Sequence, residues 1–288
     1  PTAGASGALY AVGAAITNMW SNNVPGVQAA SQASAGGIAN LNMVSDGEAQ
    51  VSIAISSNVY QCLNGTDSFK DHPYKDLKVI AGLYMNPNQV VVTAKSGIQT
   101  LADVKGKRFA VASAGSSVYN ESNAHFTAAG LKFPDDIQAE YITFTDAADM
   151  LQNGSIDGAW IMSGAPASAV TQALTGGARL VDIDDQLVKE LKAKYPWYAS
   201  YTIKAGTYPN QDRDVHTTAV KMVMFTRGDM PEDVVYNLTK ALWEHIDELG
   251  QAQKNLKGLK PEDAVKDIAG VPLHPGAEKY YREIGVLK

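Results

Sequence analysis

A loop of small residues, 113–117 (SAGSS), is the strongest candidate for ligand chemistry in the sequence. It follows an apolar run at residues 109–112 and precedes a predicted helix over residues 118–129. Serine is a common helix N-cap, and the first N–H groups of a helix have no partner within the helix. The helix dipole adds partial positive charge at the same end, so this junction is suited to an anion. Taken alone, the pattern favours an ordinary capped turn.

The same kind of junction recurs along the chain, and the recurrence favours a binding role. Small polar residues precede three other predicted helices, at Ser6-Gly7, at residues 56–58 and at Ser163-Gly164. The second and third of these follow strand-like runs at residues 50–55 and 158–162. Parallel α/β sheets bind ligands at the carboxyl ends of their strands. We therefore expect Ser6, Ser57, Ser116 and Ser163 to contribute to one site for a small anion.

The sequence contains none of the common catalytic or metal-binding patterns. The sequence holds no GxSxG, HExxH, GxxxxGK[ST] or GxGxxG, and its five histidines are scattered. The junctions lack Lys, His, Asp and Cys, and Glu121, one turn inside its helix, is the nearest acid. His125 is interpreted as a core residue, whereas Trp160, at the end of a strand, could either stack on a ligand or pack in the core. No enzyme activity, cofactor or metal site is predicted.

Composition excludes several classes of protein. The chain has 288 residues, 45% of them hydrophobic and 19% charged, with a formal net charge of −6. No basic run is present, so no nucleic-acid partner is expected, and no apolar stretch is long enough to span a membrane. The single Cys62 cannot form an internal disulfide and is interpreted as a small buried hydrophobe. Residues 1–7 have loop chemistry with no strand before them, so we expect a processed N-terminus from which a signal peptide was removed.

Alternating strand and helix patterns predict an α/β fold in two domains. Domain I is expected at residues 1–86 plus 221–288, including the C-terminal helices, and domain II at residues 87–220. The expected form is a two-domain clamshell with mixed, mostly parallel sheets, a hinge and a ligand cleft between the lobes. Expected strands include 27–33, 77–83, 89–93, 141–144 and 220–225, and expected helices include 146–152, 185–194, 231–249, 261–268 and 277–284.

Several stretches carry a resemblance to a known family. Residues 194–198 (KYPWY) with 205–208 (AGTY), and residues 273–281 (LHPGAEKYY), are the most specific. Residues 7–13 (GALYAVG) and the small-residue turn at 31–40 add to them. Nearly end to end, and lacking only a leading strand, the chain resembles the solute-binding receptors of TRAP transporters, in the TAXI subfamily. In that family the fold is the type II periplasmic-binding-protein clamshell.

The resemblance implies a periplasmic or lipid-anchored receptor that delivers a small organic acid to TRAP membrane subunits. Family members are associated with glutamate, related amino acids and 2-oxoglutarate. Carried onto this chain, the implied ligand-binding residues are Ser6, Gly7, Tyr10, Ser57, Asn58, Ser113, Gly115, Ser116, Ser117, Trp160, Ser163 and Gly164.

Three departures bear on the ligand. Ala8 and Leu9 stand where the family often has Thr and Tyr, and Ile161 stands where it often has an aromatic residue. We hypothesise a pocket that grips a carboxylate through backbone N–H groups and accepts a less polar remainder than glutamate. The alternatives left open are an enzyme on the same clamshell scaffold and an effector-sensing domain of a regulator.

Overall fold

The computed structural model describes residues 1–3 and 8–288. The chain divides into two units, one formed by residues 1–85 and 221–288 and the other by residues 86–220. Strands β2 (Leu77–Val92) and β8 (Val215–Arg227) contribute residues to both units.

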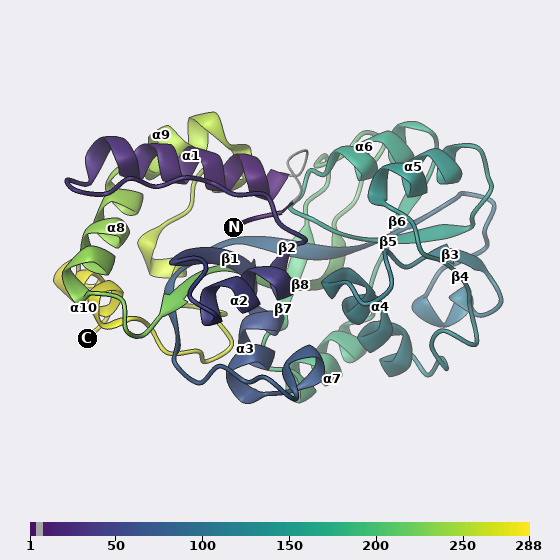
Figure 1. Ribbon diagram of the computed structural model, residues 1–288. Helices are drawn as coiled ribbons and strands as arrows, with labels where there is room; N and C mark the ends of the chain where they lie inside the picture. The colour runs from purple at the N-terminus through teal and green to yellow at the C-terminus, as the bar shows by residue number, and fades with distance from the viewer. Residues whose placement is uncertain (4–7) are drawn as a thin grey trace. The chain divides into compact units, whose positions relative to one another are not determined.

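Unit 1 packs helices around strand β1 (Val51–Ile55), which pairs antiparallel with residues 222–226 of β8. Leu41, Val44, Phe69 and Phe225 are fully or almost fully buried in its core. Helix α1 contacts α8 and α9, and Figure 1 shows α9 beside α1 and α10 next to α8. The helices of unit 1 are α1 (Ala8–Asn23), α2 (Gly37–Ser45), α3 (Ser56–Asn64), α8 (Glu232–Glu244), α9 (Ile246–Ala252) and α10 (Pro275–Glu283).

Unit 2 is built on a mixed sheet. Strand β3 (Arg108–Ala110) pairs parallel with β4 (Gln138–Glu140) and with β5 (Gly158–Met162), so all three point their carboxyl ends to one edge. Strand β2 pairs antiparallel with β5 and with β6 (Arg179–Val181), and β7 (Ala199–Ile203) pairs antiparallel with β8. The helices of unit 2 are α4 (Ser117–Ala128), α5 (Phe144–Gln152), α6 (Ser168–Thr175) and α7 (Asp185–Lys194).

Side-chain alternation along the strands gives unit 2 a core on each face of its sheet. Val91 and Ile161 pack among apolar residues of α5 and α6, whereas Val90, Val92 and Trp160 pack on the other face with residues of α4 and α7. Figure 1 shows α5 and α6 side by side on one face of these strands and α4 on the other. Because both faces are covered, the strands read as apolar runs without alternation. The expected mixed α/β class is confirmed.

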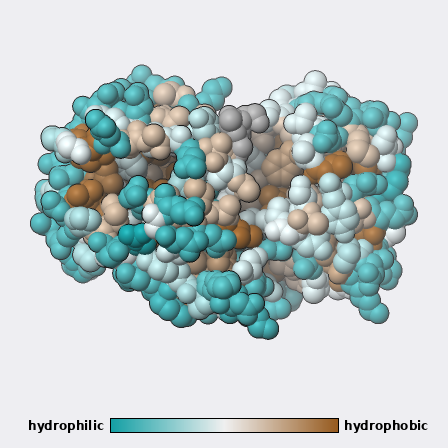
Figure 2. Space-filling model, viewed as in Figure 1, coloured by the Kyte–Doolittle hydropathy of each residue, from teal (hydrophilic) through white to brown (hydrophobic). Residues whose placement is uncertain are grey.

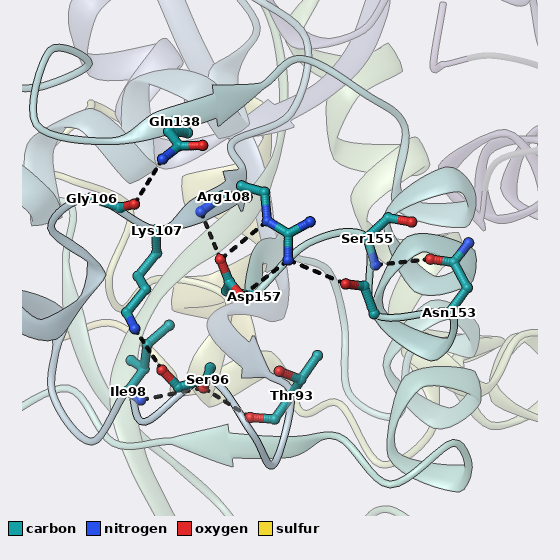
Figure 3. A network of polar contacts seen from close by, with 11 residues as sticks. Thr93, Ser96, Ile98, Gly106, Lys107, Arg108, Gln138, Asn153, Ser155 and Asp157 are labelled. Carbon is teal, nitrogen blue, oxygen red and sulfur yellow. Dashed lines mark hydrogen bonds and ion pairs between the residues drawn. The ribbon is translucent and has the colours of Figure 1, made fainter.

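Polar contacts tie the amino ends of β3 and β5 together (Figure 3). The Asp157 carboxylate accepts hydrogen bonds from the backbone N of Arg108 at 2.9 Å and from its guanidinium at 3.3 and 3.4 Å. The guanidinium also donates to the carbonyl of Gly154 at 3.2 Å. The half-buried Asp157 loses hydration, which raises the pKa of its carboxyl, but these hydrogen bonds outweigh that loss and lower the pKa overall. The carboxyl ends of these strands lie at the opposite edge of the sheet, where each strand leads into a loop.

Some sequence predictions of secondary structure are wrong. Residues 27–33 form no strand, and the predicted strand at 141–144 lies instead at Gln138–Glu140. Thr143 caps α5, its hydroxyl accepting from the Asp146 N–H at 3.2 Å, so the helix begins before the predicted residue 146. The predicted helix at 261–268 is reduced to one 3₁₀ turn, Pro261–Asp263. The runs at 77–83 and 89–93 belong to the single strand β2.

The surface of unit 1 holds a cavity of about 370 Å³, and none of the predicted site residues that the structure describes lines it. Residues from α1, from the segment after it and from α8 surround this cavity, among them Trp20, Val27, Val234 and Leu238. Figure 2 shows hydrophobic residues gathered between α8 and α1, whereas hydrophilic residues cover α10. None of the helices within residues 8–288 combines the length and apolar character needed to cross a bilayer.

Candidate functional site

The first loop of unit 2 follows β3 and leads into α4. Ser116 is the N-cap of α4, and its hydroxyl accepts a hydrogen bond from the Tyr119 N–H at 3.1 Å, which confirms the predicted cap. The Ser116 N–H donates to the Ser113 carbonyl at 3.1 Å, and Gly115 has a φ of 73°. Positive φ is accessible to glycine without strain, so Gly115 lets the backbone turn sharply before the helix. Within the described residues no partner is found for the Gly115 N–H.

The second loop follows β5 and leads into α6. Ser163 is half-buried and Gly164 is buried. Gln89 of β2 donates from Nε2 to the Ser163 carbonyl at 3.0 Å, and the Ala167 N–H donates to the Tyr208 hydroxyl at 3.0 Å. In the part of the chain that the structure describes, the Gly164 N–H donates to no partner. This loop therefore also offers an unused backbone donor.

Parallel pairing of β3 with β5 brings the two loops to the same edge of the unit 2 sheet. That edge therefore holds the predicted site residues of both loops: Ser113, Gly115, Ser116, Ser117, Ser163 and Gly164. Strands β3 and β5 are labelled in Figure 1. Both loops combine small side chains with backbone N–H donors next to a helix start. Such a pair of loops can hold an oxyanion by hydrogen bonds alone.

A network of buried polar side chains lies within unit 2, between β2, β5, β8 and α4. The Trp160 indole donates to Asn88 Oδ1 at 3.0 Å, and Asn88 Nδ2 donates to Thr218 Oγ1 at 3.0 Å and to Glu121 Oε2 at 3.3 Å. Thr218 Oγ1 lies 2.7 Å from His125 Nε2, and His125 Nδ1 lies 2.7 Å from the Glu121 carbonyl. Each of these side chains is at least 97% buried, and those of Asn88, Thr218 and His125 are fully buried.

Burial lowers the pKa of His125 to about 4, despite an opposing contribution from its hydrogen bond to the Glu121 carbonyl. The imidazole is therefore neutral at physiological pH. Burial also raises the pKa of Tyr198 well above its usual value, and the nearby Glu121 carboxylate adds to this rise. The His125 and Tyr198 rings meet edge to face, 5.0 Å apart. The predicted core role of His125 is confirmed.

Trp160 belongs to the core of unit 2. Its indole is 1% exposed and packs on Phe126 and His125, with ring centroids 5.4 and 4.7 Å away. Of the two roles that the sequence left open, packing is the one that the described residues show. Ile161 is also fully buried, on the opposite face of the strand. Ile161 therefore does not line the loop edge of unit 2, and the expectation that it makes the pocket less polar is not supported.

In unit 1 the described residues hold three of the predicted site residues. Ser57 and Asn58 lie in the first turn of α3 and are 2% and 1% exposed, and Asn58 Nδ2 donates to Gln61 Oε1 at 3.2 Å. A Cβ atom on Gly37, the first residue of α2, would lie 3.0 Å from Asn58 Oδ1, so the starts of α2 and α3 are close together. Tyr10 lies in the first turn of α1 and is half-buried. Ser6 and Gly7 lie outside the described residues.

Sequence reasoning did not single out Asn88, Gln89, Thr218 or Tyr208 as parts of a site. Asn88 and Gln89 follow an Asn-Pro pair that is typical of a turn, although here it lies inside β2. Tyr208 stood out only as part of the AGTY stretch. The described residues contain no group of three or more His, Cys, Asp or Glu side chains placed to bind a metal ion.

Solved structures with a similar fold include a periplasmic binding protein. The aliphatic sulphonate binding protein SsuA of Escherichia coli has a TM-score of 0.51 and 18% identity to this chain. The match covers 95% of this chain and 79% of the E. coli protein. The alkanesulfonate-binding SsuA of Xanthomonas axonopodis pv. citri, bound to MOPS, has a TM-score of 0.50 and 17% identity, covering 100% and 95%. XAC2383 of Xanthomonas citri, bound to ATP, has a TM-score of 0.57 and 11% identity, covering 96% and 95%.

These likenesses show that the chain has the type II periplasmic-binding-protein fold, which confirms the expected fold class. At the level of sequence, the model of the NMT1-like family matches residues 1–285. The chain therefore belongs to the NMT1-like family.

Proposed function

We propose that this protein is an extracytoplasmic solute-binding receptor for a small organic carboxylate, which it delivers to a membrane transporter. The observation that carries the proposal is the pair of unit 2 loops, which present unused N–H donors of Gly115 and Gly164 at one edge of the sheet. Backbone donors at a helix start favour a negatively charged group. Glu121 and His125, the titratable residues of α4, are committed to the buried network, which favours binding over chemical conversion.

The similar structures agree with an anionic ligand. MOPS carries a sulfonate and ATP carries phosphates, and each is bound by a protein of this fold. Carboxylates and sulfonates both accept hydrogen bonds from N–H groups, so the loops of unit 2 suit either. We place carboxylates first because residues 194–198, 205–208 and 273–281 resemble receptors for organic acids. The same resemblance supports a periplasmic or lipid-anchored location and TRAP (TAXI) membrane subunits as partners.

The part of the ligand beyond its charged group is proposed to be less polar than glutamate. This proposal now depends on Ala8 and Leu9 at the start of α1, because Ile161 is buried in the core. The ligand cleft between the two lobes stays a prediction, and so do the roles of Ser6 and Gly7.

Isothermal titration calorimetry with a panel of solutes tests the proposed function. The panel comprises glutamate, 2-oxoglutarate, hexanoate, benzoate and methanesulfonate, with hexanol as an uncharged control. We expect at least one carboxylate to bind, hexanoate or benzoate more tightly than glutamate, and hexanol not at all. Tight binding of glutamate alone would contradict the less polar pocket, and binding of methanesulfonate without any carboxylate would contradict the carboxylate class.

The described residues give no specific support to the alternatives of an enzyme or a regulator's sensing domain. The Glu121 carboxylate, which belongs to the acid nearest the junctions along the sequence, is 3% exposed and accepts a hydrogen bond from Asn88. A general acid or base needs to reach its substrate within hydrogen-bond distance. The solved structures of similar fold are binding proteins.

A further inference from the structure

We propose that Tyr208 and Gln89 are positioning residues that hold the loop after β5 in its ligand-binding shape. The Tyr208 hydroxyl donates to Gln89 Oε1 at 2.5 Å and accepts from the Ala167 N–H at 3.0 Å. Gln89 Nε2 donates to the Ser163 carbonyl at 3.0 Å. The two side chains thus bind the loop at its first and last residues. This inference rests on the proposed function, because it concerns the same loop.

Tyr208 and Gln89 together form a clamp on this loop. The clamp binds one backbone group at each end of the loop and leaves the backbone N–H groups in the middle without a partner in the described part of the chain. The Ser163 carbonyl and the Ala167 N–H are committed, and Pro166 has no N–H to offer. Within the described residues the N–H groups of Gly164 and Ala165 have no partner. A loop fixed at both ends presents those donors to a ligand without first losing conformational freedom, which favours tight binding.

Burial makes the clamp strong and specific. Gln89 is 1% exposed and Tyr208 is 3% exposed, so neither has water as an alternative partner. Burial raises the pKa of Tyr208 to about 12, against hydrogen bonds with Ala167 and Gln89 that lower it, so the hydroxyl keeps its proton at neutral pH. A protonated hydroxyl can both donate to Gln89 and accept from Ala167, as the geometry requires.

The segment that carries Tyr208 is itself fixed. The Tyr208 N–H donates to Gln211 Oε1 at 3.2 Å, and Gln211 Nε2 donates to the carbonyls of Ile203 and Arg213 at 3.2 and 2.9 Å. The Gly206 N–H donates to the Gln211 carbonyl at 2.8 Å. Tyr208 therefore reaches the β5 loop from a turn anchored to the end of β7, and the AGTY stretch acquires a physical role.

The test compares Tyr208→Phe with Tyr201→Phe. Tyr201 is partly buried against the same core cluster, and its hydroxyl makes no hydrogen bond within the described residues, so it is a matched control. Hydrogen exchange of the ligand-free protein is measured at residues 163–168, and the affinity for hexanoate and benzoate by calorimetry. We expect Tyr208→Phe to speed exchange of these amides and to weaken binding by roughly tenfold, and Tyr201→Phe to change neither.

A second variant, Gln89→Leu with Tyr208→Phe, removes the side-chain partners at both ends of the loop. It leaves no Gln89 oxygen unpaired, but it deprives the Ser163 carbonyl of its donor and the Ala167 N–H of its acceptor. We expect the double variant to unfold at no higher temperature than Tyr208→Phe, and to show exchange at least as fast and binding at least as weak. Affinity that recovers together with stability would overturn the positioning role.

The exchange measurement distinguishes failure of this inference from failure of the proposed function. Unchanged exchange at residues 163–168 in Tyr208→Phe would overturn the clamp, whatever the protein binds. Faster exchange in a protein that binds neither hexanoate nor benzoate would support the clamp and contradict the ligand class. Faster exchange with unchanged affinity for either probe would overturn the link between the clamp and binding.

Discussion

At the scale of single residues, the buried network assigns a donor and an acceptor role to every group in it. Trp160 donates to Asn88, and Asn88 donates to Thr218. The Thr218 hydroxyl then donates its own proton to His125 Nε2, which must be unprotonated to accept it. His125 Nδ1 carries the ring proton and donates it to the Glu121 carbonyl. A second proton on the imidazole would lie on Nε2, which could then no longer accept the hydrogen bond from the Thr218 hydroxyl.

Stability should fall with acid because of His125. Its pKa is 6.5 in an unfolded chain and about 4 in the folded one, so below pH 6.5 the unfolded state binds the extra proton. The stabilisation is complete above pH 6.5 and is lost as the pH falls toward 4, with a limit on the order of 3 kcal/mol. Urea unfolding between pH 7.5 and 4.5 should show a shallower pH dependence for His125→Gln than for the wild type.

The exposed His72 provides the control for this comparison. His72→Gln should follow the wild-type pH dependence. Superimposable slopes for His125→Gln and the wild type would show that the buried imidazole does not titrate in this range.

Residue identities alone could reveal the serine loops but not the clamp or the network. Ser116 stands directly before a predicted helix, and capping is a local property of sequence. Asn88, Gln89 and Thr218 are polar residues inside buried strands, and their partners lie 33 to 130 positions away along the chain. Sequence spacing carries no signal for contacts at such separation. Trp160 was ambiguous for the same reason, because its partner Asn88 is equally distant.

At the scale of elements, the start of α4 permits a test that separates capping from anion binding. Ser116→Ala removes the side-chain cap and should cost about 1 kcal/mol of stability. Ser116→Asp keeps an effective cap and interacts favourably with the helix dipole, so stability should be retained. Its carboxylate should nevertheless repel an anionic ligand.

Thermal unfolding and hexanoate or benzoate titrations of both Ser116 variants provide the measurements. We expect Ser116→Asp to lose affinity by more than Ser116→Ala does, although it is the more stable of the two. Equal or tighter anion binding by Ser116→Asp would place the ligand away from the start of α4.

The pairing of β3 with β5 depends on a glycine. Gly158 lies opposite Phe109, and a Cβ atom at residue 158 would come within 2.3 Å of the Phe109 ring, which is fully buried. Gly158→Ala should therefore overpack this core and destabilise the protein by about 1–3 kcal/mol in chemical denaturation. Adding Phe109→Leu makes space, so the double variant should be more stable than the sum of the two single changes indicates. Simple additivity would contradict the contact.

Helices were predicted more closely than strands, for reasons of local chemistry. Helix α7 has its acids first and its lysines last, with Asp184 capping it, and its bounds match the predicted 185–194. By contrast, β7 was not predicted, because its residues 199–203 alternate weakly and are only partly buried. The predicted helix over 231–249 is interrupted at His245, which separates α8 from α9. Strand pairing is decided by distant partners, which a local pattern does not encode.

At the scale of the whole molecule, the chain builds unit 1 from two separate segments and unit 2 from one continuous segment. The family match spans residues 1–285 and therefore includes both units. The domain boundaries were predicted from the Asn86-Pro87 pair and from the apolar run at residues 220–225. The ligand's identity is a different matter, because backbone donors recognise charge and say little about the rest of the molecule.

Cys62 is the only cysteine of the chain, and it lies 1% exposed in α3. Burial raises the pKa of its thiol to about 11, against a weaker opposing hydrogen bond with the backbone of Tyr74. At neutral pH the thiol is therefore both protonated and shielded, and alkylating reagents react with the thiolate. A fluorophore-maleimide should leave the native protein unlabelled, so a cysteine introduced at the exposed Tyr141 would become a single attachment point for an optical reporter of solute binding.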